Sequence, residues 1–179
     1  MEPANSPLPH NRSSEFFDDE GNFSSRFCES INLWSTALLN DDGVIEPIQP
    51  NSEITSAKII SKQDGIFVGG KIISLLCNYW APQLEFKWNF FDGDKISLGD
   101  TLVEIRGDKN QLLKIERSIL NILGRLSGIG TTANNWIKNS QIPVASTRKT
   151  TWGLLDKWAV HMGGALTHRL DRNDALMLK

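Results

Sequence analysis

The chain has 179 residues, of which 40% are hydrophobic and 22% are charged, and its formal net charge at pH 7 is −2. This composition is typical of a globular protein and excludes collagen-like and low-complexity chains. The near-neutral charge argues against a dedicated nucleic-acid binder, and no apolar run approaches the roughly 18–20 residues of a membrane span. The length allows one ordinary domain, or a small domain with part of a second.

The amino terminus and the cysteines favour a cytoplasmic protein. Residues 1–10 have neither a basic start nor an apolar stretch, so we expect no secretory signal. Cys28 and Cys77 stand in no metal-binding or redox spacing. Two reduced, buried thiols are therefore the expectation, and they suit the cytosol.

The first half of the chain predicts a small α+β domain behind a tail. Residues 1–23 are rich in Pro, Asn, Ser and acids without periodicity, so we expect a disordered tail. Apolar residues spaced by three and four then predict a helix that begins at Ser24 and ends at Asp41-Asp42-Gly43. Alternation and turn residues predict further elements in the order strand, strand, helix, strand, strand, at 56–61, 66–68, 71–80, 84–91 and 101–105.

The second half predicts parallel α/β structure. After Gly107 an apolar stripe from Leu112 to Leu126 indicates a helix of at least four turns. A short apolar strand, an amphipathic helix and a fully apolar strand follow, at 142–146, 154–162 and 175–178. Their repeat of about thirty residues is the size of a βαβ crossover, and continuous apolar strands are typical of parallel sheets buried on both faces.

Charge is distributed unevenly along the chain. Residues 1–60 contain three Lys or Arg against ten Asp or Glu, whereas residues 141–179 contain six against three. Any anionic ligand is therefore expected to bind near the carboxyl end.

Cations follow both predicted parallel strands. Arg148 and Lys149 come after the first strand, Lys179 ends the second, and His168-Arg169 lies between them. Residues at the carboxyl ends of parallel strands face the ligand site in α/β folds. Because such a cluster needs an anion to neutralise it, we expect a small ligand with at least two negative groups. The alternative is a solvated basic surface with ordinary ion pairs.

Four segments together resemble the quinolinate phosphoribosyltransferase family. Residues 147–179 (TRKTTWGLLDKWAVHMGGALTHRLDRNDALMLK) are similar to its signature of the form TRKTTPG…EKYAV…GG…HR…DA…IK. Residues 116–131 (ERSILNILGRLSGIGT) resemble its ERTALNFLQRLSGIAT-like helix, and residues 92–107 and 63–70 match its amino-terminal domain. The segments appear in the family's order and at its spacing, over roughly residues 56–179.

The resemblance implies an α/β fold, α+β overall, in two parts. An amino-terminal α/β sandwich domain is expected at residues 24–117, followed at residues 118–179 by the first βα units of an open, irregular α/β barrel. The family's later acidic residues and its Gly-rich phosphate loop would lie beyond Lys179, so we expect a truncated barrel that is inactive alone. Members of the family form homodimers, in which the amino-terminal domain of one subunit covers the barrel mouth of the other.

The activity that the resemblance implies belongs to NAD biosynthesis. Members transfer the phosphoribosyl group of phosphoribosyl pyrophosphate to quinolinate, with Mg²⁺, and release pyrophosphate and CO₂ to give nicotinate mononucleotide. By motif match, Lys149 and Lys179 are the expected catalytic residues, and no metal ligand is expected in this chain. The expected substrate-binding residues are Arg117, Arg148, Lys149, His168, Arg169 and Lys179.

Arg117 would reach the site from the neighbouring subunit. It lies opposite Ile115 on the predicted long helix, on a face that Asn121, Gly124 and Gly128 continue. Such a small, polar stripe permits close approach of a ligand or another chain, whereas an Arg on an ordinary helix face would simply be solvated.

Two substitutions depart from the family pattern, and three alternatives stay open. Trp152 stands where Pro is usual, which brings a bulky ring near the site, and Thr167 replaces a frequent Asn. One alternative is an inactive fragment that dimerises with, or regulates, a full-length enzyme. A second is a molybdenum-transport-associated relative with another base or none. A third is a biotinyl or lipoyl carrier module, suggested by residues 93–102, although neither Lys71 nor Lys87 has the setting of a carrier lysine.

Overall fold

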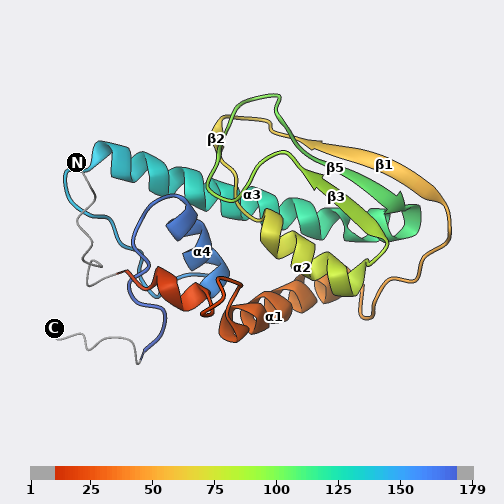
Figure 1. The fold of residues 1–179 in the computed structure, drawn as a ribbon, viewed down its shortest axis with the longest axis horizontal. Helices are drawn as coiled ribbons and strands as arrows, with labels where there is room; N and C mark the ends of the chain where they lie inside the picture. Colours follow the sequence, from red (N-terminus) through yellow and green to blue (C-terminus); the bar gives the residue numbers. More distant parts are fainter. Residues whose placement is uncertain (1–10, 173–179) are drawn as a thin grey trace.

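The computed structural model describes residues 11–172 and has a small antiparallel sheet, one long helix and a smaller helical unit (Figure 1). Its helices and strands, in chain order, are η1 (Ser13–Phe16, a 3₁₀ helix), α1 (Ser25–Asp41), β1 (Ile54–Ile60), β2 (Gly65–Ile66), α2 (Gly70–Trp80), β3 (Leu84–Trp88), β4 (Lys95–Ile96), β5 (Thr101–Asp108), α3 (Lys109–Asn139) and α4 (Leu154–Met162).

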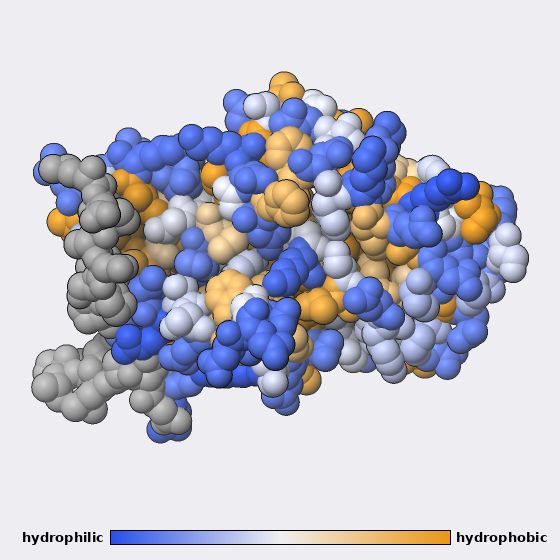
Figure 2. Space-filling model, in the orientation of Figure 1, coloured by the Kyte–Doolittle hydropathy of each residue, from blue (hydrophilic) through white to orange (hydrophobic). Residues whose placement is uncertain are grey.

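The main sheet has the strand order β1-β5-β3, with both pairs antiparallel. Alternation along β5 places Val103 and Ile105 in the core, against the layer formed by α2 and α3. On the opposite face Glu104 lies between two lysines, 2.9 Å from Lys58 and 3.5 Å from Lys87. The face of the molecule drawn in Figure 2 is mostly hydrophilic, with hydrophobic residues in small separate groups.

The buried Asp108 carboxylate fixes the point where β5 becomes α3. It accepts hydrogen bonds from the backbone N–H of Gln111 at 3.0 Å and from those of Asn51 and Ser52 at 2.8 Å each. Burial alone would raise the pKa of Asp108, but these backbone donors outweigh it and hold the pKa below its ordinary value. The carboxylate therefore caps the helix as an anion and joins it to the loop before β1.

Helix α3 connects the sheet to the helical unit around α4. Its 31 residues span about 46 Å. The amino-terminal half packs under the sheet, and the carboxyl-terminal half packs against α4. A β-carbon on Gly163 would collide with the Gly130 carbonyl oxygen, so glycine at position 163 permits the close approach at the end of α4.

Polar residues in the second half of α3 explain why its apolar stripe stops before the helix does. Ser127 Oγ accepts a hydrogen bond from the Val68 N–H at 3.0 Å, and Thr131 Oγ1 accepts one from the Ile66 N–H at 2.8 Å. These side chains hold the backbone around β2 in place of apolar contacts. The helix itself continues to Asn139.

Most predicted elements are confirmed. The helices expected at 24–41, 71–80 and 154–162 correspond to α1, α2 and α4, and the four strands of the first half lie within a few residues of β1, β2, β3 and β5. The mixed helix-and-sheet fold class is likewise confirmed. The short strand β4, which pairs with β2, was not predicted.

The prediction of a strand at 142–146 is wrong. Only Ala145 pairs there, in a single parallel bridge with Leu166. Pro143 has no N–H to donate, which prevents a regular ladder from forming at the start of this segment. The strand predicted at 175–178 lies outside the described residues.

The disorder predicted for residues 1–23 is wrong for residues 11–23. Phe16 is 1% exposed and Phe23 is 6% exposed, and both rings contact the ring of Trp158. These phenylalanines are irregularly spaced and give no periodic signal. The acidic residues around them in the sequence favoured the prediction of disorder. Residues 1–10 lie outside the described residues, and the predicted domain boundaries stay predictions.

The cysteines differ from each other. Cys77 is buried as expected, and burial raises the pKa of its thiol to about 12. Cys28 is only half-buried, and both cysteines are free thiols.

We expect the Phe16→Ala substitution to lower the free energy of unfolding by about 3 kcal/mol, because it removes a fully buried ring from the aromatic cluster. Urea denaturation would measure this. The matched control is Phe91→Ala, whose ring is 79% exposed and whose loss should change stability by less than about 0.5 kcal/mol. Equal effects of the two substitutions would contradict the burial of residues 11–23.

Candidate functional site

Four of the predicted site residues lie at one end of a parallel pairing. The Leu166 N–H donates to the Val144 carbonyl at 2.9 Å, and the Ser146 N–H donates to the Leu166 carbonyl at 2.9 Å. The two segments run in the same direction from this pairing. One continues into Arg148-Lys149 and the other into His168-Arg169. The structure therefore brings these two cationic pairs to the same end.

A buried lysine that was not predicted to be functional ties these two segments together. Lys157, in α4, is 1% exposed. Its Nζ donates to Ser146 Oγ at 2.8 Å and to the carbonyl oxygens of Thr167 and His168 at 3.0 and 2.9 Å. A buried ammonium needs such acceptors, because losing its hydration without them is costly. The position of Lys157 among apolar residues of a predicted helix was the signal that could have revealed it.

A second interaction holds the loop that carries Arg148 and Lys149. Arg125, in α3, makes a bidentate pair with the buried carboxylate of Asp156, with both hydrogen bonds at 2.8 Å. Hydrogen bonding to Asp156 raises the pKa of Arg125 above its ordinary value. The Trp152 N–H donates to the same carboxylate at 3.0 Å. The end of the loop is thereby fixed to both α3 and α4.

The Trp152 ring, at the position where the resemblance implies proline, packs against two side chains. The guanidinium of Arg125 lies 4.8 Å from its centroid. On α1, the Trp34 ring stacks with it, with centroids 6.0 Å apart and an interplanar angle of 24°. These contacts join α1, α3 and the loop. They could not be predicted, because the residues that make them are far apart in the sequence.

Arg117 is not brought to this end of the pairing. Arg117 lies on α3, 66% of its side chain is exposed, and its Nη1 is 2.6 Å from Asp42 Oδ1. It precedes Arg125 by eight residues, which places it about 12 Å further along the helix. Lys179 lies outside the described residues. Arg148 and Lys149 are exposed, whereas His168 and Arg169 are half-buried.

A cavity of about 540 Å³ lies beside the parallel pairing, between α3 and α4. Its lining is largely apolar and includes Thr132, Trp136, Val160 and Ala165, with Arg125 and Ser146 at polar positions. Because three separate segments form this cavity, it could not be predicted from the sequence.

Across residues 11–172, no group of three or more His, Cys, Asp or Glu side chains is placed to hold a metal ion. In the same part of the chain, no helix is both long and apolar enough to cross a membrane.

The fold and the cations together define a class of α/β protein: an antiparallel α/β domain joined by one long helix to a parallel unit that gathers positive charge at one end. The chain belongs to the quinolinate phosphoribosyltransferase family. The family model for the quinolinate phosphoribosyl transferase N-terminal domain matches residues 36–127, and the model for the C-terminal domain matches residues 129–179.

Curated relatives agree with this assignment. The chain is 37% identical over 128 residues to a probable nicotinate-nucleotide pyrophosphorylase [carboxylating] of Bacillus subtilis, covering 69% of this chain and 44% of the relative. It is 34% identical over 136 residues to quinolinate phosphoribosyltransferase [decarboxylating] 1b of Nicotiana tabacum, covering 74% and 38%. The chain thus spans less than half the length of these two relatives.

Solved structures share the fold. The structure of NadC from Streptococcus pyogenes superposes with a TM-score of 0.72 at 29% identity, covering 83% of this chain and 57% of that one. The nicotinate-nucleotide pyrophosphorylase of Francisella tularensis gives a TM-score of 0.73 at 25% identity, covering 83% and 56%.

We expect Arg125→Met to lower the free energy of unfolding by about 2 kcal/mol. The substitution leaves the buried Asp156 carboxylate without its guanidinium, and the partial exposure of Arg125 reduces the full cost of breaking a buried pair. The matched control is Lys58→Met, which breaks the exposed pair with Glu104 and should cost less than about 1 kcal/mol. Chemical denaturation of both variants would measure the difference, and a cost for Arg125→Met no larger than the control's would count against the anchoring role.

Proposed function

We propose that this chain provides quinolinate recognition for the carboxylating nicotinate-nucleotide pyrophosphorylase reaction of NAD biosynthesis. In that reaction the phosphoribosyl group of phosphoribosyl pyrophosphate passes to quinolinate with decarboxylation, giving nicotinate mononucleotide, pyrophosphate and CO₂. The observation that carries the proposal is the placement of Arg148-Lys149 and His168-Arg169 at the same end of the pairing between Ala145 and Leu166.

The chemistry of quinolinate suits these side chains. Quinolinate carries two carboxylates on a pyridine ring, and an arginine fork binds a carboxylate bidentately while a lysine adds a compact charge. Transfer through an oxocarbenium-like state requires the pyridine nitrogen to be aimed at the anomeric carbon, which is a matter of positioning and electrostatics. Cations around the ring would also stabilise the charge that develops during loss of CO₂. We assign the catalytic contribution to Lys149, together with Lys179.

A second subunit would complete the site. Arg117 is exposed and lies about 12 Å along α3 from Arg125, away from the other proposed site residues. This position supports a role toward a neighbouring copy of the chain. A groove of about 580 Å³ between β1 and α3 runs along the same helix. It exposes Leu113 and Leu120, which are 60% and 44% exposed. An apolar helix face of this kind favours association, so we propose a homodimer with a shared site.

The described residues do not fit a resident Mg²⁺ site, because they contain no suitable cluster of ligands. We propose that Mg²⁺ enters bound to phosphoribosyl pyrophosphate, as the co-substrate complex. A cytoplasmic location is proposed from the two free thiols.

The carrier-module alternative has no support in the fold. Lys71 lies in α2 with its Nζ 4.1 Å from the centroid of the Phe23 ring, and Lys87 lies within β3. Neither is at a hairpin tip, where a carrier lysine must be. A dimerising or regulatory partner of a full-length enzyme remains the competing function, and it does not require quinolinate binding by this chain.

We expect calorimetric titration with quinolinate to give saturable heat for the parent chain and at least about 100-fold weaker binding for the Arg148→Ala, Arg169→Ala double variant, because two charge-assisted contacts are lost. Lys58→Ala, on the far face of the sheet, serves as the matched control and should bind like the parent. Circular dichroism would first confirm that all three proteins are folded. A folded parent that does not bind quinolinate would contradict the proposal and favour the regulatory function.

A further inference from the structure

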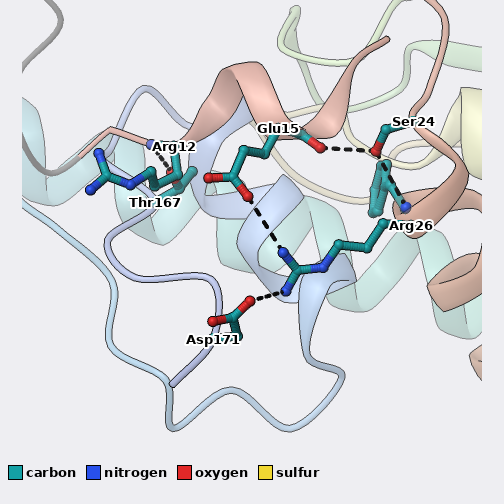
Figure 3. Close-up of polar contacts among 7 residues, drawn as sticks. Arg12, Glu15, Ser24, Arg26, Thr167 and Asp171 are labelled. Atoms are coloured by element: carbon teal, nitrogen blue, oxygen red, sulfur yellow. Dashed lines mark hydrogen bonds and ion pairs between the residues drawn. The ribbon is translucent and has the colours of Figure 1, made fainter. Parts of the chain in front are cut away.

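Residues 11–26 contact the segment from Thr167 to Asp171, which includes His168 and Arg169, at both of its ends (Figure 3). We call them the amino-terminal strap. The family match begins at residue 36, so the strap lies outside it.

The strap fixes the residue immediately before His168. Thr167 is fully buried, and its Oγ1 accepts a hydrogen bond from the Arg12 N–H at 2.7 Å. The same hydroxyl donates to Asn11 Oδ1 at 3.4 Å. The Thr167 carbonyl oxygen accepts from Lys157 Nζ at 3.0 Å. The side chain is therefore held by the strap and the main chain by α4.

Arg26 holds the same segment two residues beyond Arg169. Its Nη2 lies 2.6 Å from Asp171 Oδ2, and its Nη1 lies 3.4 Å from Glu15 Oε2 (Figure 3). The Ser24 hydroxyl donates to the Glu15 carbonyl at 2.8 Å, which closes the strap onto the start of α1. These side chains are partly exposed, so each ion pair contributes little to global stability. Their geometry restrains the segment locally.

The strap itself is anchored in the core. The rings of Phe16 and Phe23 meet the ring of Trp158 edge-on, with centroids 5.5 and 5.0 Å apart. Trp158 follows Lys157 in α4, so one helix anchors the strap and also binds the backbone of Thr167 and His168. The strap therefore restrains the segment at both ends, at Thr167 and at Asp171. Helix α4 restrains it at the Thr167 end as well.

We propose that the amino-terminal strap positions His168 and Arg169 for binding the dicarboxylate, with Thr167 and Arg26 as positioning residues. This inference rests on the proposed function. A segment fixed before the ligand arrives loses less conformational freedom on binding, so removing a restraint weakens affinity without removing a ligand contact.

The test uses the full chain and two readouts, quinolinate affinity by calorimetry and hydrogen exchange of residues 166–171 without ligand. Thr167→Val removes the hydroxyl and keeps the shape, and Arg26→Met removes an exposed charge. Thr167→Val should weaken affinity about tenfold and Arg26→Met about fivefold, and each should speed exchange of 166–171 by a similar factor, because one loses a buried hydrogen bond and the other a partly exposed charge pair. Exchange in α3 should not change. Arg26→Lys should restore most of the affinity, and Lys58→Met is the matched surface control.

Affinity within about twofold of the parent for Arg26→Met, or unchanged exchange of 166–171, would overturn the inference. Because Arg26 is exposed, this variant keeps the test decisive even if Thr167→Val does not fold. A parent that fails to bind quinolinate contradicts the proposed function instead. In that case faster exchange of 166–171 in Arg26→Met still supports the restraint by the strap, and unchanged exchange overturns it.

Discussion

The arrangement of the candidate site depends on one buried ammonium group. Lys157 Nζ has three hydrogen-bond donors, and it donates to one hydroxyl and two carbonyl oxygens from two separate segments. Burying this cation without acceptors would cost several kcal/mol, so the segments must come together around it. The placement of Arg148-Lys149 and His168-Arg169 at the same end of the pairing follows from that requirement. The cations proposed to bind the ligand are thus placed by a buried cation that is not among them.

The surrounding contacts restrain what Lys157 assembles. The Arg125–Asp156 pair and the Trp152 ring hold the first segment to α3 and α1, while the strap holds the second. Asp92 adds a link to the sheet domain, because one of its carboxylate oxygens accepts from Trp158 Nε1 at 2.8 Å and the other from the N–H groups of Gly69 and Gly70. Since these links are polar and directional, they fix orientation as well as distance.

Much of the fold could be predicted from the sequence because most elements carry a regular period. The positions of five elements were predicted to within a few residues. Apolar spacing indicated α1, α2 and α4, and alternation indicated β1 and β5. The rule that residues after parallel strands face the ligand site was applied to Arg148-Lys149 and Lys179, and it placed His168-Arg169 only between the two predicted strands, 142–146 and 175–178. The observed pairing joins Ala145 to Leu166, which was not predicted to lie in a strand, and Pro143 prevents a full strand at 142–146.

What the sequence could not predict depends on contacts between distant residues. The phenylalanines of the strap have no period, so their burial against Trp158 left no local signal. The stack of Trp34, Trp152 and Arg125 joins three segments, and each side chain alone reads as an ordinary surface or core residue. The predicted apolar stripe of the long helix stops at Leu126, and beyond it Ser127 and Thr131 bind the backbone around β2. Side chains that satisfy a distant backbone group are visible only in three dimensions.

The most direct measurement is a crystal structure of this chain grown with saturating quinolinate. The account predicts the ligand at the end of the pairing between Ala145 and Leu166, with its carboxylates between Arg148-Lys149 and His168-Arg169 and with Lys157 still bonded to both segments. Quinolinate bound elsewhere on the chain, or an ordered pairing with no ligand at that end, would contradict it.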